Sequence, residues 1–177
     1  MKKLCASLVL CGLGVVSANS YAEGYLAVGY AQLEQNDRFF GDDRFDTGDL
    51  VVKLGADINE YFGAEMRLGT TVVSNEESVA GGDLEYRQNY FYGGYLRARW
   101  SNKTVLTPYA VLGVAHAKET LDTPAGSFSD DWTDTSYGAG VDLDITDSVA
   151  INAEYVLYRD KDNVTIKGPA ASVVWRF

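Results

Sequence analysis

The chain has 177 residues, of which 46% are hydrophobic, 23% charged and 12% aromatic. This length corresponds to one domain, and its 18 glycines and 3 prolines form no periodic or low-complexity run, which excludes collagen-like and disordered classes. The formal net charge of −10 argues against a nucleic-acid binder, because such proteins carry a basic surface.

Residues 1–22 have the pattern of a cleaved secretory signal peptide. Lys2 and Lys3 give a positive start, and every residue in 4–18 is apolar or small. Small residues at the expected cleavage site follow. We therefore predict a mature domain over residues 23–177, made by an exported protein.

Both cysteines lie inside the predicted signal peptide. Cys5 and Cys11 would be removed with it, so the mature domain is expected to contain no disulfide and no thiolate metal site. A lipid-modified Cys11 is the alternative. Leu10 fits that motif poorly, and the apolar stretch continues well past the cysteine.

From residue 23 onward, apolar residues recur at every second position, which is typical of strands with one apolar face. In the segment 63–70, for example, even positions hold Ala, Met, Leu and Thr, and odd positions hold Gly, Glu and Arg. Eight such strands are predicted, at residues 24–33, 46–58, 62–73, 85–100, 105–118, 135–144, 148–158 and 164–177.

The predicted connections alternate in length along the chain. Short turns are expected near residues 59–61, 101–103 and 146–147, and long polar connections at 34–45, 74–84 and 119–134, with a short one near 160–163. Short turns at one end and long loops at the other are typical of outer-membrane β-barrels. No stretch of 18 apolar residues follows residue 22, so no transmembrane helix is expected.

The alternation alone leaves two architectures open. A membrane barrel turns its apolar face outward, whereas a soluble β-sandwich or lipocalin-like barrel turns it inward. The signal peptide, the tyrosines and tryptophans near strand ends, and the apolar C-terminal strand favour lipid outside. We therefore predict an all-β fold: an eight-stranded antiparallel transmembrane up-and-down β-barrel.

With lipid outside, the other face of each strand points into the lumen. The charged residues assigned to that face are Glu65, Arg67, Arg97, Arg99, Asp142, Glu154 and Arg176. A gated polar conduit and a lumen-filling ion-pair network are both compatible with this set. An eight-stranded barrel is only wide enough for its own side chains, which favours the network. The pairing depends on the barrel shear, which the sequence does not give.

The long connections combine acidic with aromatic residues. Candidates for extracellular contact are Phe39, Phe40, Asp42, Asp43, Phe45, Phe128, Asp130, Asp131 and Trp132. Partner contact, divalent-cation bridging to lipopolysaccharide phosphates, and a merely solvated loop all fit these residues. The acids have no spacing typical of a calcium-binding loop, so no metal site is assigned.

Catalytic and cofactor motifs are missing from the sequence. There is no phosphate-binding glycine loop and no HExxH motif, and His116 is the single histidine. His116 lies between two alanines, without an evident partner for acid–base catalysis. We predict a non-enzymatic protein without a cofactor; the alternative is a lipid-A-modifying or proteolytic barrel enzyme.

Several segments resemble the small eight-stranded outer-membrane barrels. The chain ends in VVWRF at 173–177, and a terminal Phe resembles the signal read by the outer-membrane assembly machinery, which implies that role for Phe177. The segments 29–32 (GYAQ), 109–118 (YAVLGVAHAK) and 136–141 (SYGAGV) resemble the outer membrane protein X and attachment-invasion (Ail, Lom) group. OmpA-type and porin-family small barrels are similar more broadly.

This resemblance implies a Gram-negative protein of the cell outer membrane. The implied partners are outer-membrane lipid and lipopolysaccharide, the assembly machinery during biogenesis, and host or matrix proteins through the loops. The implied roles are surface interaction or adhesion, or a contribution to envelope integrity. A narrow porin-like channel is the alternative, and in such folds the loops carry the function.

Overall fold

The computed structural model describes residues 23–37, 44–73, 76–79, 82–102, 104–123, 126–161 and 164–177. The predicted signal peptide lies outside these residues, as do the contact candidates Phe39, Phe40, Asp42 and Asp43, so those assignments stay predictions. No helix in the described part of the chain is long and apolar enough to cross a membrane.

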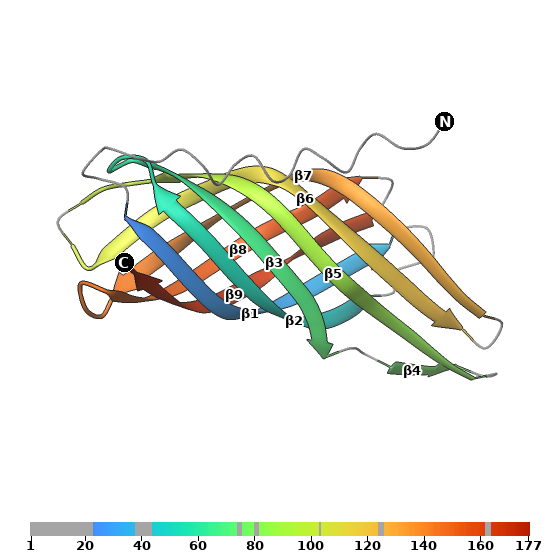
Figure 1. Cartoon of the computed structure of the whole chain (residues 1–177). Coiled ribbons are helices and arrows are strands. Elements are labelled where there is room, and N and C mark those ends of the chain that lie inside the picture. The colour runs from blue at the N-terminus through green and yellow to red at the C-terminus, as the bar shows by residue number, and fades with distance from the viewer. Residues whose placement is uncertain are drawn as a thin grey trace, which may run out of the picture.

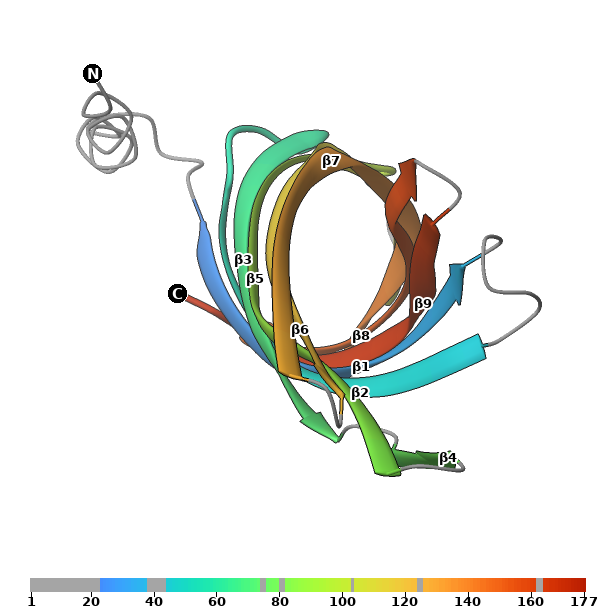
Figure 2. The same cartoon turned by 90° about the vertical axis from the view of Figure 1, so that its right-hand side faces the viewer.

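The described residues form nine strands, all paired in antiparallel fashion. They are β1 (Gly24–Asp37), β2 (Arg44–Asp57), β3 (Phe62–Val73), β4 (Glu76–Val79), β5 (Gly82–Arg99), β6 (Leu106–Thr123), β7 (Gly126–Asp144), β8 (Val149–Lys161) and β9 (Val164–Arg176). All except β4 form a ring in the order β3-β2-β1-β9-β8-β7-β6-β5, closed by pairing of β3 with β5 (Figures 1 and 2). The predicted eight-stranded barrel is confirmed, and β4 pairs with β5 outside the ring.

The strands end close to the predicted positions at the turn end and run further than predicted at the other end. A long loop over 119–134 was expected, but β6 continues to Thr123 and β7 begins at Gly126, so that prediction is wrong. Likewise β1 continues to Asp37. Periodicity in a sequence reports burial, not backbone pairing. Most residues of 119–123 and 126–134 are polar, so the apolar pattern fades while the ladder continues.

The structure assigns the two strand faces that the sequence left open. On β3 the side chains alternate strictly: Met66 and Leu68 are 46% and 53% exposed on the outside, whereas Glu65 and Arg67 are 4% and 0% exposed inside. Leu54 on β2 faces outward beside Met66. An apolar exterior around a charged interior excludes the soluble sandwich and lipocalin-like alternatives and suits a lipid surround.

Inward-facing tyrosines lie over glycines on the neighbouring strand. Tyr25 is paired with Gly55, and a Cβ atom at Gly55 would lie 2.2 Å from Tyr25 Cζ. Tyr109 is paired with Gly140, where a Cβ atom would lie 2.5 Å from the Tyr109 hydroxyl oxygen. Glycine therefore makes the space in which each ring lies against the wall and carries its hydroxyl into the lumen.

The lumen is divided into two layers along the barrel axis. The layer toward the long-loop end is mainly apolar, although the buried Asp49 is paired with Ala31 within it. Its apolar members are Ala31, Leu33, Val51, Phe91, Ala115, Ala117, Trp132, Val156, Tyr158, Ile166 and Ala170. Phe91 and Tyr158 meet edge to face within it, at 5.4 Å between ring centroids. The layer toward the turn end holds most of the buried charges and is described below.

The depth of a lipid-facing residue should decide the cost of charging it. Leu68→Arg places a cation near the bilayer midplane and should lower the free energy of unfolding by about 2–4 kcal/mol. Val72→Arg, four residues further out on the same strand, should cost about 0–1 kcal/mol. Denaturant unfolding of the protein in lipid vesicles, followed by tryptophan fluorescence, measures both. Equal costs at the two positions would contradict the assigned membrane depth.

Candidate functional site

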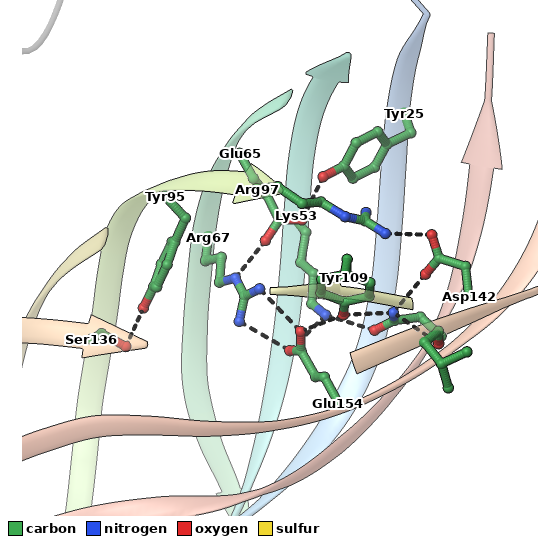
Figure 3. A network of polar contacts seen from close by, with 12 residues as sticks. Tyr25, Lys53, Glu65, Arg67, Tyr95, Arg97, Tyr109, Ser136, Asp142 and Glu154 are labelled. Atoms are coloured by element: carbon green, nitrogen blue, oxygen red, sulfur yellow. Dashed lines mark hydrogen bonds and ion pairs between the residues drawn. The ribbon is translucent and has the colours of Figure 1, made fainter. Parts of the chain in front are cut away.

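The polar layer of the lumen is the largest cluster of interacting charged side chains in the described part of the chain (Figure 3). Its side chains come from strands all around the ring and point toward one another. Its members are Tyr25, Lys53, Glu65, Arg67, Tyr95, Arg97, Tyr109, Ser136, Asp142, Asn152 and Glu154. We refer to this set as the lumen network.

Glu154 is the acceptor at the centre of the lumen network. Arg67 binds it in bidentate geometry, with Nη1 and Nη2 each 3.0 Å from one carboxylate oxygen. Lys53 Nζ donates to Oε1 at 2.7 Å, and the Tyr109 hydroxyl donates to Oε2 at 2.8 Å. The Glu154 side chain is fully buried. Several charge-assisted hydrogen bonds thus compensate its lost hydration.

Arg67 is also held by a second carboxylate. Its Nε donates to Glu65 Oε1 at 2.5 Å, and the other oxygen of Glu65 accepts a hydrogen bond from the Tyr25 hydroxyl at 2.5 Å. The Tyr95 ring lies under the guanidinium, 4.4 Å from its centroid. Arg67 therefore uses both its edge and its face for binding.

A second ion pair, between Arg97 and Asp142, joins the lumen network through Asn152. Asn152 Nδ2 donates to Asp142 Oδ1 at 2.7 Å and to the Tyr109 hydroxyl at 2.7 Å, while its Oδ1 accepts from Lys53 at 3.0 Å. Arg97 lies 3.8 Å from the centroid of the Tyr109 ring. One amide thereby connects the two groups of charges.

The sequence-predicted lumen charges fall into two groups. The structure brings Glu65, Arg67, Arg97, Asp142 and Glu154 together in the lumen network. Arg99 and Arg176 lie at the turn-end rim instead, where Arg99 Nη1 is 2.5 Å from Asp57 and Arg176 Nη1 is 2.8 Å from Asp144. Arg176 also approaches Asp142 at 3.6 Å. The functional roles of these residues stay predictions.

Sequence reasoning missed several members of the lumen network. The missed members are Lys53, Asn152 and three tyrosines, and all lie at inward positions of the period-two pattern. For Lys53 the alternation of its strand was enough to place a charged residue on the inward face. Tyr109 and Tyr158 were expected at a membrane interface, because aromatic residues gather there in outer-membrane barrels. Both are buried instead, at 6% and 3% exposed, as are Tyr25 and Tyr95, at 3% each.

The lumen network balances charge and fills space. Lys53, Arg67 and Arg97 are matched by Glu65, Glu154 and Asp142, and every one of these side chains is buried. Paired charges of this kind are suited to blocking a lumen, not to guiding an ion through it. Among the described residues, no group of metal-ligating side chains is arranged to hold an ion.

His116 lies on the outer surface of β6, away from the lumen network. Its Nδ1 is 2.8 Å from the Thr133 hydroxyl, and its ring is 4.9 Å from that of Tyr92. Neither neighbour is a carboxylate that would orient the imidazole as a general base. His116 shares this outward face of β6 with Val114, which is 53% exposed.

The predicted contact residues at the outer end lie on strands. Phe45, Phe128 and Asp130 belong to β2 and β7, and Asp131 is exposed on β7. Trp132 was expected in an exposed loop but lies within β7 and is buried, because the alternation of β7 turns it into the mouth of the barrel. Its ring there contacts the Arg159 guanidinium at 5.3 Å.

Three strands project beyond the rest of the barrel at the outer end. The β6–β7 ladder extends to the pair Thr123–Gly126, whereas the β7–β8 ladder covers only Tyr137–Asp144 (Figure 1). The Ser136 hydroxyl donates to the Leu157 carbonyl at 2.9 Å just past the end of that ladder. We call β4 together with the parts of β5, β6 and β7 beyond the ring the projecting sheet.

Comparisons with known proteins agree with this architecture. The family model described as outer membrane protein beta-barrel domain matches residues 4–177. Ail, the attachment invasion locus protein of Yersinia pestis, is similar in structure at 24% identity, with a TM-score of 0.63 and coverage of 89% of this chain and 99% of that one. No curated protein matches the chain in sequence.

Two further solved structures have the same fold at lower identity. Neisserial surface protein A (NspA) gives a TM-score of 0.72 at 15% identity, covering 87% of this chain and 97% of that one. The N-terminal β-barrel domain of OprF from Pseudomonas aeruginosa gives 0.64 at 12% identity, covering 89% and 98%. Identities this low show a shared fold and no more.

Removing the central acceptor should destabilise the barrel. Glu154→Ala leaves Lys53 and Arg67 short of a buried partner and should cost about 3–5 kcal/mol of unfolding free energy. Asp131→Ala, at an exposed position on β7, should change it by less than about 0.5 kcal/mol. Denaturant titration in vesicles, with gel mobility of unheated samples as a check on folding, measures both. A harmless Glu154→Ala would show that water already fills this part of the lumen.

Proposed function

The chain belongs to the outer membrane protein beta-barrel domain family and lies in the outer membrane, and we propose that it acts there as a non-enzymatic surface-interaction protein. In bacterial barrels the short turns face the periplasm and the longer connections face outward. On that orientation the projecting sheet stands outside the cell. The closed barrel serves as its support.

The edge of β7 carries this proposal. Beyond Tyr137 the ladder with β8 has ended, while β7 remains paired with β6 as far as Gly126. The backbone on that side of β7 is not continued by a further strand among the described residues. A strand edge of this kind can accept an extended segment of another protein as an added strand. Contact with other molecules is the function that such an edge supports best.

The charge of the projecting sheet favours a cationic partner. Its strand segments contain Arg87 and Lys118 against the acids Glu76, Glu77, Asp83, Glu85, Glu119, Asp122, Asp130, Asp131 and Asp134. Ail of Yersinia pestis has been crystallised with sucrose octasulfate, a heparin analogue and a polyanion. The acidic residues here favour a basic protein segment over a polyanion, because complementary charge steers association.

Assembly and lipid contact complete the proposal. The exposed Phe177 directly follows β9, and its backbone exchanges two hydrogen bonds with Gly24, at 2.9 and 3.1 Å, where the first and last strands meet. Its position supports the assembly-signal role inferred from its sequence. The apolar exterior supports contact with outer-membrane lipid and lipopolysaccharide, and Ail has likewise been studied in a phospholipid bilayer nanodisc.

Shortening the projecting sheet should separate surface contact from envelope integrity. Replacing residues 120–129 by Asn-Gly joins the paired residues Glu119 and Asp130 through a two-residue hairpin turn and leaves the ring intact. Cells producing this variant should lose adhesion to cultured host cells or immobilised matrix protein. Their detergent resistance and serum survival should match those of wild type.

The control for charge keeps the edge and removes its acids: Asp130→Asn with Asp131→Asn and Asp134→Asn. This variant should bind basic partners more weakly, with a smaller dependence on salt. An envelope role would replace surface interaction if three results came together. Wild-type cells would show no adhesion, deletion of the whole protein would sensitise cells to detergent, and the shortened variant would fully restore detergent resistance.

The narrow-channel alternative predicts ion conduction, which the lumen network opposes. Wild-type protein in planar lipid bilayers should give no discrete conductance steps. The double variant Arg67→Ala with Arg97→Ala removes two bulky side chains from the lumen network and should introduce small steps if it folds, as checked by gel mobility. Stable steps in the wild-type protein would make the channel the better proposal.

A further inference from the structure

A groove with a volume of about 700 Å³ opens on the outer surface at the turn end, where β3, β5 and β6 meet. Its walls and floor come from Phe62, Ala98, Trp100, Pro108 and Ala110. A volume of this size is typical of sites for small organic ligands. The groove opens on the outward face of the barrel, and Tyr109 of the lumen network lies behind its floor.

The shape of the groove follows from a change in side-chain size along one row of the sheet. Phe62 on β3 is paired with Ala98 on β5, and Ala98 is paired with Ala110 on β6. The two alanines make a low floor. Phe62 rises at one end and Trp100 on the turn side, 55% and 76% exposed. Aromatic walls over a methyl floor suit a hydrocarbon chain.

The groove lies at the depth of the periplasmic membrane boundary. Trp100 directly follows β5, and its backbone N–H donates to the Pro108 carbonyl at 2.8 Å, next to the turn that leads into β6. The outward residues one step toward the membrane centre, Leu96 and Leu112, are apolar and more than half exposed. The groove is thus continuous with the lipid-facing band, and its aromatic wall sits where headgroups begin.

Arg99 supplies a positive charge at the polar end of the groove. Its guanidinium donates to Asp57 Oδ2 at 2.5 Å, to the Glu60 carbonyl at 3.0 Å and to the Asn59 carbonyl at 3.3 Å. A guanidinium has five N–H donors, so two of them are left. Arg99 is one of the residues that line the groove, and its side chain is 23% exposed.

We propose that this groove binds one phospholipid of the periplasmic leaflet. An acyl chain would lie on Ala98 and Ala110 between Phe62 and Trp100, and the phosphate would accept hydrogen bonds from Arg99 and the neighbouring Ser101 hydroxyl. The turn-end position selects a phospholipid over lipopolysaccharide, which the outer leaflet holds. The charge of Arg99 selects a phosphate-bearing lipid over a neutral one.

The experiment is native mass spectrometry of the full-length protein purified from bilayers of phosphatidylglycerol. Wild type should retain one phospholipid per protein. Ala110→Leu fills the groove while keeping the surface apolar, and retention should fall at least tenfold. Ala153→Leu is the matched control, because it enlarges an exposed alanine on β8 that lies outside the groove.

A second arm identifies the headgroup chemistry. Bilayers doped with diacylglycerol of the same chains should yield no retained diacylglycerol, because it offers no phosphate to Arg99. Equal retention of phospholipid by wild type and Ala110→Leu would overturn the proposal. Retention of diacylglycerol, or of lipopolysaccharide in place of phospholipid from mixed bilayers, would overturn it as well. Each of these results is independent of adhesion by the projecting sheet.

Discussion

The bidentate contact between Arg67 and Glu154 crosses the barrel from wall to wall. In the ring order, β3 and β8 are four strands apart in either direction, so this pair joins opposite sides. A barrel surrounded by lipid satisfies its backbone through closure, but closure alone does not fill the inside. The lumen network fills it with charges that must be matched across the lumen. Lys53 and Tyr109 bind the same Glu154 carboxylate, and Glu65 binds the same Arg67 guanidinium.

The two layers of the lumen fill the barrel with side chains of different chemistry. Toward the turn end, charges and tyrosine hydroxyls satisfy one another. Toward the long-loop end, Phe91, Tyr158 and their neighbours fill the lumen with mainly apolar side chains. The outward face has a simpler requirement, since its side chains only need to be apolar to lie against lipid. Above Ala98 and Ala110 this outward face is hollowed into a groove.

Much of this architecture could be predicted from the sequence, because a barrel in lipid imposes one strong rule on every strand. The alternation around Met66 and Leu68 located both the strand and its charged face, and the turns near residues 59–61 and 146–147 were placed correctly. The rule loses force outside the membrane, so residues 119–123 of β6 and 126–134 of β7 were taken for a loop, and Trp132 with them. The partners of Arg67 were beyond reach for another reason. They depend on the stagger of the closed sheet, which no single strand encodes.

The sequence separation of the lumen contacts bears on how the barrel assembles. Lys53 and Glu154 are 101 positions apart, and Arg67 and Glu154 are 87 apart. Contacts between such distant residues form late, because a long chain loop must first be closed. Until β3 meets β5, the charges of the lumen network have no fixed partners and depend on water for stabilisation. A half-closed sheet in the bilayer would expose these charges to lipid, and this exposure would raise its free energy. Insertion of the strands into lipid and closure of the ring therefore have to proceed together.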